Sequence, residues 1–243
     1  WLEGRSLSHT QNVAYFPIME LLKRLLGLRE DMVRSDAARA LDAWGAEYFS
    51  ASDREIVLPI LKSLLGLDLD ATARDRLRYL DAEGLKRQTF YAIRQGLRAV
   101  ARAAPAVVFM EDLHWADDSS LELLRYLLPQ VLELPVLFVF PMRPEREQGS
   151  WKLRQFALSE YAARTTEISL APLSAQAANQ LLANLLAIED LPASLRDLIL
   201  ARAEGNPFYV EEIVRSMIDQ KMIEQVNLRW RTTHAINELN LPS

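Results

Sequence analysis

Two continuous apolar runs lie in the middle of the sequence, AVVFM at residues 106–110 and VLFVF at residues 136–140. Each run is short, contains β-branched and aromatic residues, and is bounded by proline, which is typical of a strand. Between them, SSLELLRYLLPQVLE (119–133) has the apolar spacing of a helix. Strands that are apolar throughout and separated by helices indicate a parallel sheet covered on both faces. The sequence therefore predicts an α/β fold, with TTEISL (165–170) as a weaker further strand.

Residues 12–103 are predicted to be almost entirely helical, because apolar residues recur there at three- and four-residue spacing. Two of these helices are expected to stop at Gly27 and Gly66, and the longest helical pattern runs from about Asp81 to Ala103.

The last third of the sequence again has helical periodicity. Ser174 is a candidate N-cap, Gly205 a candidate C-cap, and Pro207 suits the first turn of a final helix. VNLRWRTT, near residue 230, alternates as a short strand does.

These patterns divide the chain into three parts. Residues 1–172 are predicted to form an α/β core, with the helical insertion at about 12–103, and residues 173–226 a small helical domain. Residues 227–243 would contain the short strand and the start of a truncated following domain.

Composition and charge exclude several classes of function. The net charge of −5 argues against direct nucleic-acid binding, and the absence of cysteine excludes disulfides and thiolate chemistry. No apolar run approaches the roughly 18 residues that span a bilayer. The amino end, WLEGRSLSHT, has neither an initiator methionine nor a signal pattern, so we expect a fragment of a longer cytoplasmic protein.

The first apolar run ends in two adjacent acids, Glu111 and Asp112, and Arg143 follows the second run. Open parallel sheets bind their ligands beyond the carboxyl ends of their strands. A buried strand followed by two acids is the layout of a Walker B element, in which one carboxylate holds Mg²⁺ and its neighbour orients an attacking water. Ordinary strands also end in acids, so this layout by itself is a weak signal.

The longer string VVFMEDLHWADDSSLELLRYLL closely resembles the Walker B region of signal-transduction ATPases with numerous domains (STAND). The resemblance is strongest to the AAA-like P-loop ATPase modules of bacterial class III adenylate/guanylate cyclase-linked proteins and LuxR-type transcription regulators. WLEGRSLS is similar to the second strand of that module, VLFVFPMRPE to the fourth strand with its sensor arginine, and AEGNPFYVEEIVRSM to the lid motif. The resemblance implies a three-layer P-loop NTPase-like sheet followed by a helical lid domain.

The resemblance also implies ATP and Mg²⁺ as cofactors, with Glu111 as the metal-coordinating acid and Asp112 as the water-orienting acid. Their order is reversed relative to the common Asp-Glu, so both residues are candidate metal ligands and the two roles could be exchanged. Arg143 matches the sensor that contacts the γ-phosphate; the alternative is an arginine that pairs with the two acids. His114 belongs to the motif and would tie the strand end to the next loop; the alternative is an ordinary packed histidine.

Gly205, Asn206 and Pro207 match the lid turn that contacts the base; the alternative is that they only end one helix and begin the next. For Asp117 a role as the cap of the following helix is favoured over a role at the metal.

The sequence departs from the family pattern in one respect. Phosphate binding requires G-x-x-x-x-G-K-[ST], and none of the eight glycines here is followed by lysine. The resemblance places this Walker A loop, with the first strand, upstream of Trp1. That first strand would lie between residues 136–140 and 165–170, so the sheet is expected to lack one of its central strands.

The function implied is an ATP-binding and ATP-hydrolysing switch module of a multidomain signalling or transcription-regulatory protein. Its expected partners are nucleotide, the neighbouring domains of the same chain, and further copies in a nucleotide-dependent homo-oligomer. Without the phosphate-binding loop, the fragment alone is expected to be inactive. The alternative is a non-catalytic interaction scaffold derived from such an ATPase.

Overall fold

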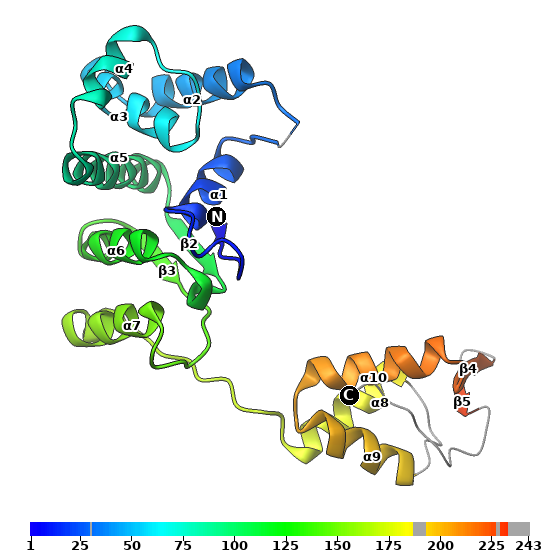
Figure 1. Ribbon diagram of the computed structural model, residues 1–243. Coiled ribbons are helices and arrows are strands. Elements are labelled where there is room, and N and C mark those ends of the chain that lie inside the picture. Colours follow the sequence, from blue (N-terminus) through cyan, green and yellow to red (C-terminus); the bar gives the residue numbers. More distant parts are fainter. Residues whose placement is uncertain (30, 187–192, 227–228, 233–243) are drawn as a thin grey trace. The chain divides into compact units, whose positions relative to one another are not determined.

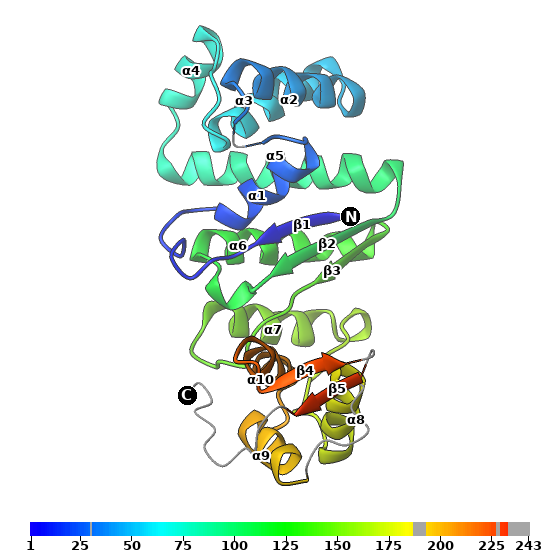
Figure 2. The ribbon, with the colours of Figure 1, turned by 90° about the vertical axis from the view of Figure 1, so that its right-hand side faces the viewer.

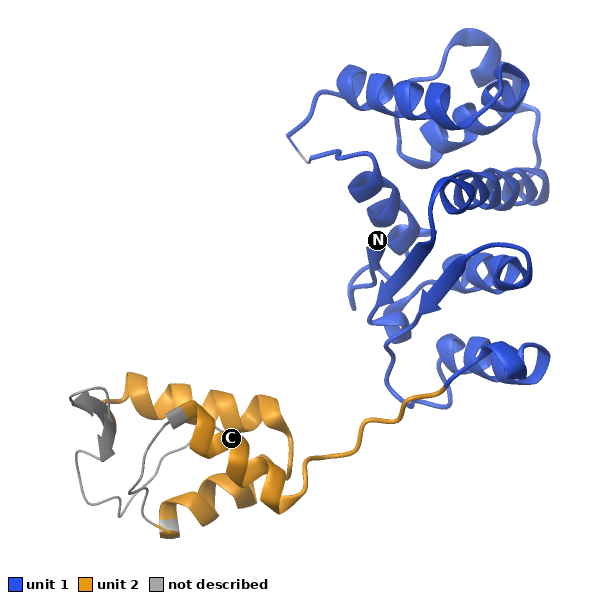
Figure 3. Cartoon of the chain, turned by 180° about the vertical axis from the view of Figure 1, so that it is seen from behind, with its two compact units in different colours: residues 1–166 blue, residues 167–243 orange. Residues whose placement is uncertain are grey.

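A computed structural model of the chain describes residues 1–29, 31–186, 193–226 and 229–232 (Figure 1). The chain divides into two compact units, Trp1–Thr166 and Glu167–Ser243 (Figure 3), and each unit is described by itself. The boundary drawn from the sequence, after residue 172, falls in a stretch at 165–174 that has neither helix nor strand.

Unit 1 is built on a parallel sheet of three strands in the order β1–β2–β3. Because the strands are parallel, their carboxyl ends meet at one edge of the sheet, and the register places Arg5 opposite Glu111. The strands predicted at residues 106–110 and 136–140 are confirmed. Their bounds are Leu2–Arg5 for β1, Ala106–Glu111 for β2 and Val136–Val139 for β3.

The helices α1 (Phe16–Leu25), α5 (Ala82–Ala103) and α6 (Asp118–Leu127) pack on one face of this sheet (Figure 2). On that face the strand residues Val108 and Met110 are buried in the same core as the helices.

The opposite face of the sheet is partly exposed to solvent. Trp1 stacks on Phe109 with ring centroids 5.4 Å apart, yet Trp1 is 73% and Leu137 58% exposed. The predicted covering of both faces, and with it a third layer, is therefore not found among the described residues of unit 1. The reason is topological: right-handed crossovers that advance in one direction across a parallel sheet place all their helices on the same face.

The helical insertion predicted at about residues 12–103 forms and ends its helices where expected. Gly27 and Gly66 have φ of +64° and +65°, and in both cases the following residue donates its amide to a carbonyl five residues earlier, at 2.8 Å. These are Schellman motifs, which a glycine in the left-handed conformation allows. Between α1 and α5 the insertion contains α2 (Arg34–Tyr48), α3 (Ala51–Leu64) and α4 (Ala71–Arg78).

The strand predicted at residues 165–170 is wrong. This segment forms no ladder, and its apolar residues Ile168 and Leu170 are 79% and 91% exposed. A strand needs a neighbouring edge for its backbone hydrogen bonds, and the strand expected between this segment and β3 does not occur among the described residues. Unit 1 instead ends with α7 (Gly149–Glu160) and a 3-10 turn at Ala162–Arg164.

Unit 2 contains helices that pack around a core of their own; a helical lid domain at residues 173–226 stays a prediction. Ser174 accepts the amide of Ala177 at 3.2 Å and so acts as the predicted N-cap. Residues 233–243, which include the predicted start of a following domain, lie outside the described residues. The elements of unit 2 are α8 (Ala175–Leu186), α9 (Ala193–Ala203), α10 (Pro207–Asp219) and an antiparallel hairpin of β4 (Ile223–Val226) and β5 (Arg229–Thr232).

None of the helices in the described part of the chain is both long enough and apolar enough to cross a bilayer.

Candidate functional site

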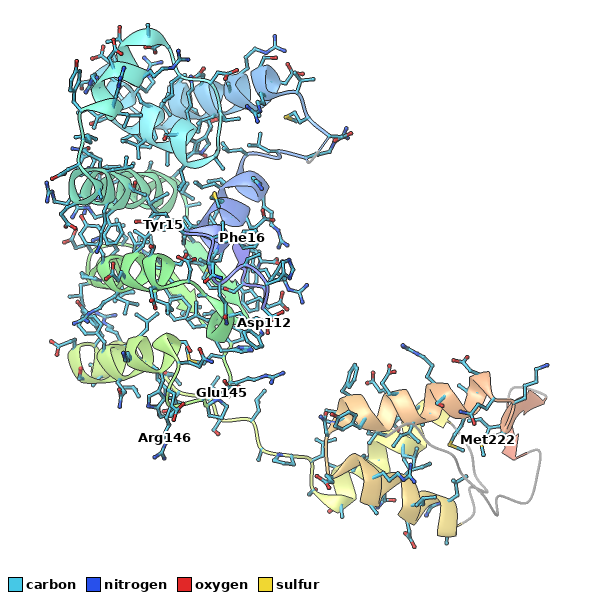
Figure 4. All side chains as sticks on the ribbon, viewed as in Figure 1. Tyr15, Phe16, Asp112, Glu145, Arg146 and Met222 are labelled. Atoms are coloured by element: carbon cyan, nitrogen blue, oxygen red, sulfur yellow. The ribbon has the colours of Figure 1, made fainter. Side chains whose placement is uncertain are left out.

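The carboxyl end of β2 presents two acids in succession. Glu111 is the last residue of the strand, and Asp112 has a left-handed backbone with φ of 53° and ψ of 41°. Aspartate is among the residues that adopt this conformation most readily. The chain therefore turns at once into a 3-10 turn, Leu113–Trp115, in which the amide of Trp115 donates to the carbonyl of Asp112 at 2.8 Å. Both carboxylates stay at the edge of the sheet, and Figure 4 labels Asp112 there.

Arg5, at the end of the neighbouring strand β1, pairs with both acids. Its Nε lies 3.3 Å from Oε2 of Glu111, and its Nη2 lies 3.7 Å from Oδ2 of Asp112. A backbone hydrogen bond joins the two strands next to this pair: the amide of Ser6 donates to the carbonyl of Glu111 at 3.0 Å. All three side chains remain open to solvent, with 51%, 40% and 39% of the Arg5, Glu111 and Asp112 side chains exposed.

Sequence reasoning assigned no role to Arg5. The available signal was its position at the end of WLEGR, a stretch similar to a strand of the same parallel sheet. A charged residue at the carboxyl end of such a strand must lie along the edge that carries Glu111.

Arg143, the predicted sensor, lies on the exposed loop after β3. Among the described residues no ion pair joins it to Glu111 or Asp112, so the guanidinium that faces these acids belongs to Arg5 instead. Figure 4 labels Glu145 and Arg146 farther along the same loop. Contact of Arg143 with a γ-phosphate remains a prediction.

His114 is only 4% exposed and packs against Trp115, with ring centroids 4.8 Å apart. Neither of its ring nitrogens has a hydrogen-bond partner among the described residues. Burial lowers the pKa of His114 below its usual value; the charge of Arg143 also lowers this pKa, while Asp112 and Glu145 oppose the shift. The geometry therefore agrees with the packed-histidine alternative, and its predicted place in the cofactor site stays a prediction.

Asp117 is the N-cap of α6, as favoured from the sequence. Its Oδ1 accepts the amide of Ser120 at 2.9 Å, and its Oδ2 accepts the hydroxyl of Ser120 at 2.6 Å. Oδ1 also accepts the amide of Tyr15 at 3.0 Å. These three hydrogen bonds, and an exposure of only 6%, give the Asp117 carboxylate a structural role.

The predicted base-binding turn, Gly205–Asn206–Pro207, belongs to unit 2. Gly205 has φ of +77°, and its carbonyl accepts the amide of Leu173 at 2.7 Å; a Cβ at this position would lie 2.6 Å from the carbonyl oxygen of Leu173. Asn206 caps α10 by accepting the amide of Phe208 at 3.0 Å, and Pro207 occupies the first turn. The turn thus has a clear structural function, and contact with a base remains a prediction.

The two acids suit a Mg²⁺ ion that takes its other ligands from phosphate and water. No group of three or more His, Cys, Asp or Glu side chains is gathered for a metal in the described part of the chain. Mg²⁺ typically uses only one or two carboxylates beside phosphate oxygens and waters. The guanidinium of Arg5 lies close to one oxygen of each acid. The two carboxylates are therefore near enough to each other to interact with the same cation.

Comparison with known proteins gives two family matches. Residues 1–139 match the family described as AAA ATPase domain. Residues 174–231 match a family described as a domain of unknown function (DUF8739).

A stretch of 62 residues is 37% identical to the uncharacterized protein R02095 of Rhizobium meliloti (strain 1021). The match covers 26% of this chain and 6% of that protein, so the chain corresponds to a small part of the relative. No solved structure gives a significant match to the chain.

Proposed function

Because this chain belongs to the AAA ATPase domain family, we propose that it is part of an ATP-dependent switch and that Glu111 and Asp112 form its Mg²⁺ and water site. The observation that carries the proposal is the position of these two carboxylates. A buried parallel strand holds them at the sheet edge, open to solvent and facing a common cation. This is the edge at which open parallel sheets bind their ligands.

In this proposal one carboxylate coordinates Mg²⁺ and the other accepts a hydrogen bond from the attacking water. Bound Mg²⁺ would neutralise charge on the transferred phosphate. Arg143, on the loop that follows β3 at the same edge, would bind the γ-phosphate through its guanidinium. In unit 2, Gly205, Asn206 and Pro207 would contact the base.

The finer assignment, also proposed, is a STAND-type module within a large cytoplasmic signalling or transcription-regulatory protein. Two observations support it. The sequence carries the extended string EDLHWADDSS after the strand, and the matched relative is far longer than this chain. The phosphates would be held by a G-x-x-x-x-G-K-[ST] loop, which residues 1–243 do not contain.

The test is ATP binding and turnover in a longer chain that adds the residues encoded upstream of Trp1, once the coding DNA has been read for a G-x-x-x-x-G-K-[ST] motif there. Asp112→Ala is expected to lower turnover by on the order of a hundredfold while ATP binding is largely kept, because a group that positions or activates water contributes about that factor. Asp118→Ala is the matched control, since Asp118 is an exposed acid at the start of α6 and away from the strand end.

The competing function is a non-catalytic interaction scaffold. The exposed face of the sheet, with Trp1 and Leu137, favours it. An upstream frame without the phosphate-binding loop, or a longer chain that neither binds nor hydrolyses ATP, would reject the ATPase in favour of the scaffold.

A further inference from the structure

We propose that Arg5 is the resident counter-cation of Glu111 and Asp112, and that it competes with the divalent ion for these two carboxylates. Arg5 is thus a positioning residue, which holds both acids in place when no metal is bound and must release them when metal enters. This inference rests on the proposed function, because that proposal assigns Mg²⁺ to the two acids.

The backbone register brings Arg5 to the acids. Arg5 is paired with Glu111 across the two strands, and the next backbone hydrogen bond, from Ser6 to the carbonyl of Glu111, keeps the strands together just beyond this pair. Directly opposed side chains on neighbouring strands are close enough for opposite charges to interact. The sheet therefore fixes the backbone of Arg5 within reach of the two acids.

The guanidinium reaches both carboxylates through different nitrogens. Nε faces Glu111 at 3.3 Å and Nη2 faces Asp112 at 3.7 Å, so a single cation bridges two adjacent acids. Adjacent carboxylates repel each other unless a positive charge lies between them. A divalent ion that binds either carboxylate would compete with this guanidinium for the same negative charge.

The exposure of the site makes the exchange feasible. About half of the Arg5 side chain is accessible to solvent, which leaves it room to move away. Exposed ion pairs are weak, and a divalent cation carries twice the charge of a guanidinium. The apparent metal affinity is then proportional to the fraction of molecules in which Arg5 has released the acids.

The experiment measures Mn²⁺ binding to residues 1–243 without nucleotide, from the electron paramagnetic resonance signal of free Mn²⁺ at fixed ionic strength. Arg5→Met is expected to bind Mn²⁺ about two- to fivefold more tightly than the original chain, which corresponds to the loss of a weak competing pair. Adding Asp112→Asn to Arg5→Met should abolish the gain.

Arg24→Met is the matched control. Arg24 is a half-exposed arginine that pairs with Glu3, on the same strand as Arg5, so its replacement removes one positive charge without touching the two acids. A gain with Arg5→Met that Arg24→Met does not share supports the proposal. Equal affinities of the two variants, including no detectable binding by either, would overturn it.

Two further measurements distinguish an effect of the Arg5 charge from a loss of folding. Arg5→Gln supplies a second neutral variant, and circular dichroism of each protein shows whether it is folded. Because the assay contains no nucleotide, it is independent of the turnover assay: a gain in Mn²⁺ affinity without any ATP turnover in the longer chain would retain the role of Arg5 and reject the ATPase.

Discussion

The backbone amide of Tyr15 donates a hydrogen bond to the carboxylate of Asp117, 3.0 Å away in space and 102 residues away in sequence. Tyr15 has a left-handed backbone with φ of 61° and is the N-cap of α1, while Asp117 is the N-cap of α6. One buried carboxylate therefore fixes the starts of two helices that cover the same face of the sheet.

Replacing Asp117 with alanine should destabilise unit 1 by about 2–4 kcal/mol. The change removes a helix cap, which contributes about 0.5–2 kcal/mol, and leaves the Tyr15 amide without its partner, which costs about 1–3 kcal/mol. Urea unfolding followed by tryptophan fluorescence measures the loss. Asp118→Ala, one residue later at an exposed position, should cost less than about 1 kcal/mol, because it removes only a favourable interaction with the helix dipole. Similar losses for both variants would contradict the structural role of Asp117.

Replacing Gly4 with alanine should strongly disturb the packing of α1 on β1. A Cβ at Gly4 would lie 2.3 Å from the carbonyl oxygen of Pro17 and 2.8 Å from Sδ of Met110. Since the Pro17 atom belongs to the backbone of α1, relief requires a shift of the helix, and we expect a cost of about 3 kcal/mol.

Gly96→Ala provides the comparison for Gly4. A Cβ at Gly96 would meet only Cη2 of Trp44, at 3.4 Å, and this glycine lies inside α5. Alanine favours a helix by up to about 1 kcal/mol over glycine. Thermal unfolding should therefore show a lower Tm for Gly4→Ala and an unchanged or higher Tm for Gly96→Ala; a Gly4→Ala protein as stable as the original would refute the predicted clash.

Replacing His114 with phenylalanine should leave stability nearly unchanged. Both ring nitrogens are buried without a described partner, so an apolar ring of similar shape loses no hydrogen bond that the structure shows. His114→Ala should instead cost about 2–4 kcal/mol, because it leaves a cavity beside Trp115. Equilibrium unfolding of the two variants distinguishes packing from hydrogen bonding: a large loss with phenylalanine would show that a ring nitrogen of His114 ties the strand end to its surroundings.

The carboxyl group of Glu3 should titrate below the usual range for glutamate. The hydrogen bond from Arg24 is the main cause of this lowered pKa, and the indole of Trp1 contributes a second hydrogen bond. Since the charged form is favoured in the folded chain, these contacts are present above the usual pKa and are lost as the pH falls through the lowered value. Carbon-13 NMR titration should show the Glu3 pKa rising in Arg24→Met; an unchanged value would mean that Arg24 does not set it.

Features that depend on neighbours in the sequence were predictable. The two apolar strands, the helix ends at Gly27 and Gly66, and the cap at Asp117 all follow from periodicity or from hydrogen bonds that close within a few residues. The AAA-like family was also recognisable from the string that follows the strand at Glu111, and the match of residues 1–139 supports it.

The tertiary structure decided how these elements meet, and there two expectations were wrong. Residues 165–170 have the composition of a strand but pair with no strand among the described residues, and the sheet carries its helices on one face because of the order of its strands. The pairing of Arg5 with Glu111 and Asp112, like the bond from Tyr15 to Asp117, also required the folded chain. Local patterns determine which residues form a strand or end a helix, because those energies arise within a few residues. Register and strand order bring distant residues together, and they depend on contacts that no short stretch of sequence contains.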